Sequence, residues 1–327
     1  MIMSQTPLRM SFVGGGSDLP AFYRRGGGAV LSTAIDKYVY VSVNPKFDGG
    51  IRLAYSRTEE VAELGQIEHR LFKATFEDMG IAGGVEVTTT ADIPSRGTGL
   101  GSSSTFTVGL LNVMSSYLGR ASSAEQLARQ ACAIEIERCG EPIGKQDQYA
   151  AAFGGLNLIA FNPDDTVSVE PVAVDADVHA RLQDELLVLY TGKQRSASHI
   201  LQHQTEEVAS NPRVREALGR MAELAYVLRD ELQAGRLDGF GEILRENWAL
   251  KKRLSNGITN EAIEAWHDAA MAAGATGGKL MGAGAGGFLM FHAPQDRHET
   301  ITRAVGLRRV KMEFEDRGSR ILFPNPR

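Results

Sequence analysis

The sequence predicts an α+β protein built from two domains. Its 327 residues exceed the usual size of a single hydrophobic core, so two domains are the default expectation. The first half mixes strand-like and helix-like segments, whereas helical patterns dominate from about Arg195 and the chain ends in strands. We therefore expect an N-terminal domain over residues 1–185 and a C-terminal domain over residues 186–327.

Strands are expected where apolar and β-branched residues alternate between turn-forming residues. Six stretches show this pattern: YVYVSVN from Tyr38, GVEVTTTA from Gly84, GGLNLIAF from Gly154, ELLVLYTG from Glu185, GGFLMFH from Gly286 and RRVKMEFE from Arg308.

Helices are expected where apolar residues recur at helical spacing. The pattern covers residues 61–80, 102–118, 123–139, 196–233 with a break at Pro212, 239–254 and 261–273. Ser102 or Ser103 is expected as the N-cap of the second helix, and Ser122 with Glu125 as a capping box for the third.

Charge and cysteine content narrow the possible partners and compartments. The formal net charge is −5 and the isoelectric point is about 5.9, with acidic and basic residues mixed along the chain, so we expect no nucleic-acid partner. No apolar run approaches the roughly 20 residues needed to cross a bilayer, and we expect a cytoplasmic protein without a membrane partner. Cys132 and Cys139 lack metal-binding spacing and are expected to be reduced.

The stretch RGTGLGSSST, residues 96–105, has three glycines followed by a run of hydroxyls. Glycine clusters mark unusual dihedral angles or the close approach of a group to the backbone. The order strand, glycine loop, helix directs free N–H groups and the positive end of a helix dipole toward an anion, which suits a nucleoside triphosphate. The alternative is a tight turn without a ligand.

Two further glycine clusters lie in RMSFVGGGSDLPAFY and KLMGAGAGGFLMFHA. The second contains GxGxxG at Gly282, Gly284 and Gly287, but it leads into a strand instead of a helix, so a dinucleotide-binding fold is the weakest alternative. The loop at 96–105 also lacks the lysine that follows the last glycine of a Walker A motif.

These three motifs, in this order, resemble the GHMP kinases, the superfamily of galactokinase, homoserine kinase, mevalonate kinase and phosphomevalonate kinase. The middle motif contains GLGSS of the superfamily signature, and the resemblance extends over essentially the full length. The stretches TPLRMSFVGGGSDLPAFY, GEPIGKQDQYAAAFGGLN and YTGKQRSASHIL most resemble D-glycero-D-manno-heptose 7-phosphate kinases. The resemblance implies a ribosomal-S5-like N-terminal domain, a ferredoxin-like C-terminal domain and an active site between them.

The resemblance implies ATP as phosphoryl donor, with Mg²⁺. The expected phosphate cradle consists of Gly97, Gly99, Leu100, Gly101, Ser102, Ser103 and Ser104. Mg²⁺ prefers oxygen ligands, and the resemblance assigns it to Ser103 and Glu135. Ser102 and Ser104 are alternatives for the hydroxyl, Glu137 is one for the carboxylate, and either glutamate is alternatively a solvated helix residue.

Two residues are expected to act on the transferred group. In the resembling enzymes the aspartate that matches Asp147 faces the attacking hydroxyl as a base. The structural alternative is a cap for the helix that follows. Arg9 matches a basic residue that stabilises developing negative charge, and its alternative is a surface ion pair.

The acceptor is expected to contact the first glycine motif. Asp18 matches a position that holds sugar hydroxyls in galactokinase-like enzymes, whereas Gly15 and Gly16 replace the Glu–His pair of galactokinases and leave room for a larger sugar. Cations for a substrate phosphate are expected first from Lys193 and Arg195. The remaining candidate cations are Arg24, Arg25 and Lys145.

One pair of histidines has the spacing of metal ligands, but we expect it to be structural. His199 and His203 stand four residues apart, a spacing that can hold zinc, but no third ligand is evident, so we expect a half-exposed helix face.

We therefore expect an ATP- and Mg²⁺-dependent kinase that gives the 1,7-bisphosphate of the heptose for nucleotide-activated heptose, as in capsule or lipopolysaccharide synthesis. One alternative is a kinase for fucose or a uronic acid, and another is a non-catalytic sugar and ATP sensor on the same scaffold. The oligomeric state is open, with a homodimer as one expectation.

Overall fold

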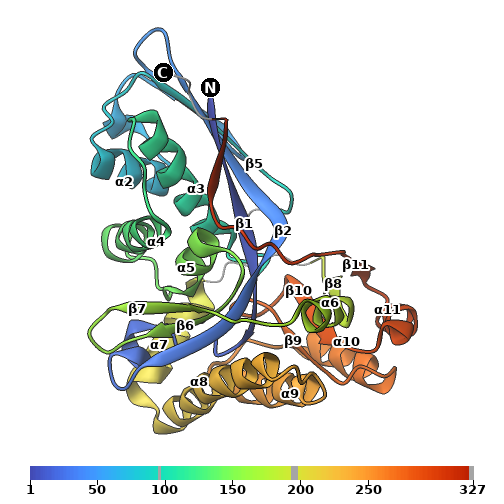
Figure 1. Ribbon diagram of the computed structural model, residues 1–327. Helices are drawn as coiled ribbons and strands as arrows, with labels where there is room; N and C mark the ends of the chain where they lie inside the picture. Colours follow the sequence, from blue (N-terminus) through green and yellow to red (C-terminus); the bar gives the residue numbers. More distant parts are fainter. Residues whose placement is uncertain (95–96, 193–197, 324–327) are drawn as a thin grey trace.

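The computed structural model in Figure 1 describes residues 1–94, 97–192 and 198–323, in which two sheets are covered by helices. The strands are β1 (Ile2–Val13), β2 (Gly28–Pro45), β3 (Ile51–Ala54), β4 (Thr58–Val61), β5 (Val85–Ala91), β6 (Leu156–Phe161), β7 (Val167–Pro171), β8 (Leu186–Tyr190), β9 (Gly277–Leu280), β10 (Phe288–His292), β11 (Arg308–Arg309) and β12 (Arg320–Phe323). The α-helices are α1 (Pro20–Tyr23), α2 (Arg70–Met79), α3 (Ser102–Tyr117), α4 (Ala124–Cys132), α5 (Gln146–Phe153), α6 (Ala176–Asp184), α7 (Ser198–Ser210), α8 (Pro212–Gln233), α9 (Phe240–Lys251), α10 (Glu261–Ala272) and α11 (His298–Val305). None of the helices in the described ranges has the length and apolar character that a membrane crossing requires.

The long antiparallel strands β1 and β2 organise the larger sheet. This sheet has eight strands in the order β12-β1-β2-β5-β3-β4, with β6 paired to β2 and β7 paired to β6. The first part of β2 pairs with β6 and its second part with β5, so the sheet divides along β2. Because β1 is buried along most of its length, its polar residues near the C-terminal end lie in the interior.

The second sheet has the order β11-β8-β10-β9, and it shares a hydrophobic core with the first. Phe12 on β1 packs edge-on against Phe240 of α9, with ring centroids 5.4 Å apart. β12 returns to pair with β1, so that Phe323 lies opposite Met3. The division into domains over 1–185 and 186–327 stays a prediction.

Two expected helix caps are wrong. The N-cap of α3 is Gly101 and not Ser102 or Ser103, because Gly101 with φ +79° ends the glycine loop in a left-handed conformation and the serines already belong to the helix.

The capping box of α4 lies one residue later than expected. Ser123 accepts a hydrogen bond from the Gln126 N–H at 3.2 Å, and the Gln126 side chain accepts one from the Ser123 N–H at 2.8 Å. Ser122 instead donates to the Ser115 hydroxyl, so Ser122 and Glu125 do not form the box. The sequence showed the right type of signal but offered two adjacent serines.

Three expected elements are shorter than their patterns. Residues 61–80 contain an α-helix only from Arg70 to Met79, and the helix expected through Cys139 becomes a π-helix at Ala133–Arg138. In RRVKMEFE only Arg308–Arg309 is a strand, and the following residues make isolated contacts such as the Val310 N–H bond to the Val188 carbonyl.

Candidate active site

A cavity of about 700 Å³ lies where the end of β1, the loop before α3 and the start of α5 meet the C-terminal half. Its wall includes Arg9 and Asp147 from the N-terminal half, together with residues of α7, α9 and β9. Both halves of the chain therefore build this cavity, which brings together most of the residues that the sequence singled out.

The loop before α3 presents backbone N–H groups to the cavity. Gly97, Gly99 and Gly101 have φ angles of +67°, +78° and +79°, which glycine adopts without a steric penalty. The buried Leu100 side chain anchors the loop in the core. The N–H groups of residues 102–104 have no acceptor among the described residues, as is usual for the first turn of a helix. Free donors at the positive end of α3 favour an anion.

The third glycine motif packs directly against this loop. A Cβ on Gly99 would lie 3.0 Å from the Gly282 Cα and would collide with the Met281 carbonyl, so the two backbones touch without side chains between them. A Cβ on Gly287 would likewise collide with the Thr98 carbonyl. The motif therefore supports the phosphate loop, a role that the sequence did not reveal because the two motifs are distant in the chain.

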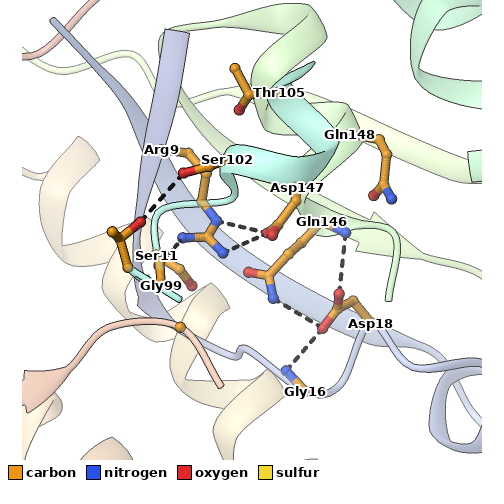
Figure 2. Close-up of polar contacts among 12 residues, drawn as sticks. Arg9, Ser11, Gly16, Asp18, Gly99, Ser102, Thr105, Gln146, Asp147 and Gln148 are labelled. Atoms are coloured by element: carbon orange, nitrogen blue, oxygen red, sulfur yellow. Dashed lines mark hydrogen bonds and ion pairs between the residues drawn. The ribbon is translucent and has the colours of Figure 1, made fainter. Parts of the chain in front are cut away.

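Arg9 and Asp147 form a partly buried ion pair beside the loop, as Figure 2 shows. The Arg9 Nε donates to the Asp147 Oδ1 at 2.8 Å, the Nη2 lies 2.6 Å from the same oxygen, and the Nη1 donates to the Gly99 carbonyl at 2.7 Å. Arg9 is 3% exposed, which excludes a surface ion pair. The N-cap of α5 is Lys145, which excludes Asp147 as that cap.

Asp18 links the first glycine motif to the start of α5. Its carboxylate accepts hydrogen bonds from the Gly16 N–H at 2.9 Å, the Gln146 N–H at 3.2 Å and the Gln146 side chain at 3.3 Å (Figure 2). Burial raises the pKa of Asp18, and the nearby Asp147 charge adds to this effect. Asp18, Gly15 and Gly16 all line the cavity, so the residues expected to contact the sugar lie beside the Arg9–Asp147 pair.

Glu135 lies behind the serines of the loop and is fully buried. It accepts hydrogen bonds from the hydroxyls of Ser103 at 3.3 Å and Thr107 at 3.0 Å, and from the Gln148 amide at 2.6 Å. Burial raises the pKa of Glu135 to about 7, and the side chains of Ser104, Gln148 and Thr107 oppose the shift. Glu137 is exposed, so Glu135 is the glutamate beside the expected phosphate cradle.

The cations expected from the sequence do not gather in the cavity. Lys193 and Arg195 lie outside the described residues. Lys145 donates to the Asp165 carbonyl at 3.0 Å, and Arg24 pairs with the Asp165 carboxylate at 3.1 Å. Lys145, Arg24 and Arg25 are not among the residues that line the cavity, so their placement does not support a contact with the substrate.

Two buried lysines that the sequence patterns did not single out line the cavity instead. The Lys279 ammonium donates to the carbonyls of Ser11 at 2.7 Å and Phe12 at 2.9 Å, and Lys251 donates to the Gly282 carbonyl. Burial lowers the pKa of Lys251 to about 8 and that of Lys279 well below its usual value. Neither forms an ion pair among the described residues, so the cavity favours anionic ligands. Lys279 is a single lysine in an apolar stretch, and Lys251 begins the charged run KKR, which is typical of an exposed helix end, so neither gives a recognisable pattern.

A second cavity of about 1070 Å³ adjoins the same loop. Ser102 and Ser103 line both cavities, and the second also contains the aromatic side chains of Tyr55, His69 and Phe106. The N-terminus of α3 therefore stands between a polar chamber with Arg9 and Asp147 and a chamber with an aromatic wall.

The two histidines of α7, His199 and His203, are exposed. The His203 Nδ1 lies 2.9 Å from the Ser255 hydroxyl, which gives this ring a hydrogen-bond partner on another segment. Residues 1–94, 97–192 and 198–323 contain no cluster of three His, Cys, Asp or Glu side chains that could hold a metal ion.

Comparison with known families defines the class of protein. The family model for the GHMP kinases N-terminal domain matches residues 66–155, and the model for the GHMP kinases C-terminal region matches residues 228–308. The chain belongs to the GHMP kinase superfamily and has its mixed α/β two-sheet fold, so the expected fold is confirmed and a dinucleotide-binding fold is excluded. It is an ATP-dependent kinase with an alcohol group as acceptor.

Relatives that match most of the chain define it further as a GHMP sugar kinase. The D-glycero-alpha-D-manno-heptose 7-phosphate kinase of Campylobacter jejuni is 29% identical over 319 residues, 93% of each chain. The crystal structure of a D-glycero-D-manno-heptose 1-phosphate kinase from Bacteroides thetaiotaomicron has a TM-score of 0.82 and 27% identity, and covers 100% of both chains. The bifunctional fucokinase/GDP-fucose pyrophosphorylase of Arabidopsis thaliana is 26% identical over 88% of this chain and 29% of its own length.

We predict that Gly99→Ala separates the two glycine loops. The added Cβ collides with backbone that cannot rotate away, so the dissociation constant for ATP is expected to rise about tenfold, which corresponds to ~1.4 kcal/mol. Gly119→Ala is the control, because Gly119 has a similar φ of +73° but a Cβ added there would have no atom within 4 Å. Calorimetric titration with ATP measures both variants, and equal affinities in the two would contradict the supporting role of the third motif.

We predict that Glu135 makes stability depend on pH. The pKa of Glu135 is about 7 in the folded protein, whereas an ordinary glutamate has a pKa of 4.5. Between these two pH values the folded state therefore binds more protons than the unfolded state. The contribution of Glu135 to stability is therefore complete below about pH 4.5 and is lost as pH rises through about 7. Glu135→Gln does not titrate, so its free energy of unfolding relative to wild type is expected to rise by roughly 3 kcal/mol from pH 4.5 to pH 8. Denaturant unfolding over this range measures the difference, and a constant difference would refute the assignment.

Proposed function

We propose that the protein transfers the γ-phosphoryl group of ATP to the anomeric oxygen of D-glycero-D-manno-heptose 7-phosphate and forms the 1,7-bisphosphate. The observation that carries the proposal is the Arg9–Asp147 pair, which stands beside a loop of free N–H donors in one cavity. The similarity to a heptose 7-phosphate kinase over 93% of both chains supports the choice of sugar.

The residues present suit phosphoryl transfer, which depends mainly on positioning and charge stabilisation. The N–H groups at the start of α3 hold phosphate oxygens, and Asp147 accepts the proton of the attacking hydroxyl. Arg9 orients the Asp147 carboxylate and, because it also binds the Gly99 carbonyl, fixes it relative to the phosphate loop. The guanidinium stabilises negative charge that develops between the two groups.

We assign the nucleoside of ATP to the second cavity and the sugar to the first. The second cavity offers aromatic side chains for a base, whereas the first contains Asp147, Asp18 and the buried cations. Ser102 and Ser103 stand between the two, where the phosphates would lie.

Mg²⁺ fits beside the loop serines. The Glu135 carboxylate is buried, has only neutral hydrogen-bond donors among the described residues, and lies next to the Ser103 hydroxyl, so a divalent cation would stabilise its charged form. Ser103 and Glu135 would hold the ion, which would supply charge neutralisation for the phosphates. The Ser103 hydroxyl and the Glu135 carboxylate provide the hard oxygen ligands that Mg²⁺ prefers.

A fucose kinase is the second candidate, because the Arabidopsis relative is named a fucokinase. The buried cations of the cavity favour a substrate that carries its own phosphate, which fucose does not. The cytoplasmic location, a homodimer, and the contacts of Lys193 and Arg195 with a substrate phosphate stay predictions.

We predict a strong preference for the phosphorylated heptose. A charge-assisted contact contributes about 1.5–3 kcal/mol, so kcat/KM for heptose 7-phosphate is expected to exceed that for the unphosphorylated heptose by about tenfold or more. A coupled ADP-release assay over heptoses, fucose, uronic acids and their phosphates measures this. Highest kcat/KM for fucose or another free sugar would overturn the proposed substrate.

We predict that Asp147→Asn lowers kcat by on the order of 10²–10⁴-fold, because the amide cannot accept the proton. ATP affinity is expected to change little, since the loop donors remain. Asp78→Asn is the matched control, because Asp78 also pairs with an arginine, Arg138, but outside the cavity. Single-turnover rates and ATP titrations compare the variants, and wild-type kcat in Asp147→Asn would exclude the base assignment.

A further inference from the structure

Three buried polar atoms, each on a residue that lines the cavity, have no hydrogen-bond partner among the described residues. They are the Ser11 Oγ, the Gln146 Oε1 and the Gln204 Nε2. Ser11 is 6% exposed and Gln204 is 4% exposed, so both side chains are withdrawn from bulk water. Buried polar groups in folded proteins are normally paired, because an unpaired one is costly. Three such atoms in one cavity wall indicate a ligand that supplies their partners.

The three atoms surround Gly15 and Gly16 of the first glycine motif. A Cβ on Gly15 would lie 3.6 Å from the Ser11 Oγ and 3.8 Å from the Gln146 Oε1. A Cβ on Gly16 would collide with the Gln204 Nε2. Ser11 comes from β1, Gln146 from α5 and Gln204 from α7, so segments far apart in the sequence converge on these two glycines.

The three atoms lie near Arg9 and Asp147, and this position indicates which part of the sugar they would contact. Gln146 directly precedes Asp147 and reaches from α5 to Asp18, as Figure 2 shows. Ser11 lies two residues beyond Arg9 on β1, which corresponds to about 7 Å along a strand. A sugar whose reacting oxygen meets Asp147 would therefore extend its other carbons toward Gly15.

The three unpaired atoms are suited to bind the neutral hydroxyl groups of a ligand. The serine hydroxyl donates and accepts, the Gln146 carbonyl accepts, and the Gln204 amide nitrogen donates. Sugar hydroxyls also donate and accept, so they can pair with all three atoms.

We propose that Ser11, Gln146 and Gln204 form a subsite for hydroxyl groups of the acceptor sugar on the carbons away from the anomeric centre. This rests on the proposed function of the cavity as the sugar site. Contact with the ligand requires these side chains to turn toward the cavity, which for Ser11 is rotation about one bond. Gly15 leaves space that this part of the sugar would occupy, whereas the side chain of Gln204 already fills the space beside Gly16.

Ser11→Ala and Gln204→Leu test the subsite without touching the reacting residues. Each removes one neutral hydrogen bond to the sugar, so kcat/KM for the sugar is expected to fall about fivefold while KM for ATP is unchanged. The melting temperature is expected to stay equal or rise, because in the free protein the removed atom has no partner among the described residues. A merely structural role would give the opposite result, with a lower melting temperature and unchanged kcat/KM.

Gly15→Ala tests whether the sugar occupies the space beside Gly15. Gly15 does not have a positive φ, and its Cβ would make only ordinary van der Waals contacts, so the fold is expected to tolerate alanine while kcat/KM for the sugar falls. Thr75→Val is the matched control, because the Thr75 hydroxyl is also buried without a partner among the described residues but lies outside both cavities. Thr75→Val is expected to leave kcat/KM for the sugar and KM for ATP unchanged.

All variants are assayed with the sugar for which wild type has the highest kcat/KM in the panel. If that sugar is not heptose 7-phosphate, the proposed substrate fails, and the same variants still decide whether the subsite binds sugar hydroxyls. If Ser11→Ala and Gln204→Leu both stay within twofold of wild type, the subsite proposal is overturned whichever sugar is used. Absence of turnover with every sugar would overturn both.

Discussion

The direct contact between two glycine loops holds the catalytic centre together. Gly99 lies against Gly282 and Gly287 lies against Thr98, so the phosphate loop of one half is supported by backbone from the other. Any side chain at these positions would push the loops apart. Because Arg9 binds the Gly99 carbonyl, the same contact also fixes the guanidinium, and through it Asp147. The glycines thus set the position of charged groups that lie beyond them.

The positive charge around the cavity follows from this arrangement. Arg9 is neutralised by Asp147, but Lys251 and Lys279 have only carbonyl partners among the described residues. A buried ammonium without a carboxylate is unfavourable in the free protein, as its lowered pKa shows. A bound phosphate removes part of that cost, so the free cavity is arranged for a charged ligand. The two buried lysines therefore lower the stability of the protein without a ligand and raise its affinity for anions.

Local motifs made much of this predictable. The glycine loop was found from one short stretch whose residue types reflect a backbone requirement, and Arg9 and Asp147 were found because the motifs around them resemble those of GHMP kinases. Lys279 was missed because it is one lysine in its segment, and Lys251 because it begins a charged run that is typical of a solvated surface. Only the packing of α9 and β9 against β1 brings the two lysines to the cavity. The same limit applies to Ser122 and Ser123, where adjacent serines offer the same cap and the helix register selects between them.

The position of α3 between two cavities explains why the chain needs both halves for one reaction. Its N-terminal serines line the aromatic chamber on one side and the polar chamber on the other, so in the proposed arrangement phosphates bound there would face the nucleoside on one side and the sugar on the other. The polar chamber is closed by α7, α9 and β9, which supply Gln204, Lys251 and Lys279. The N-terminal half carries the loop donors and most of the proposed sugar contacts, Ser11, Asp18 and Gln146 among them, and the other half adds a few side chains to the same wall. Acceptor specificity can therefore change in part through α7, α9 and β9 while the phosphate loop and the Arg9–Asp147 pair stay the same.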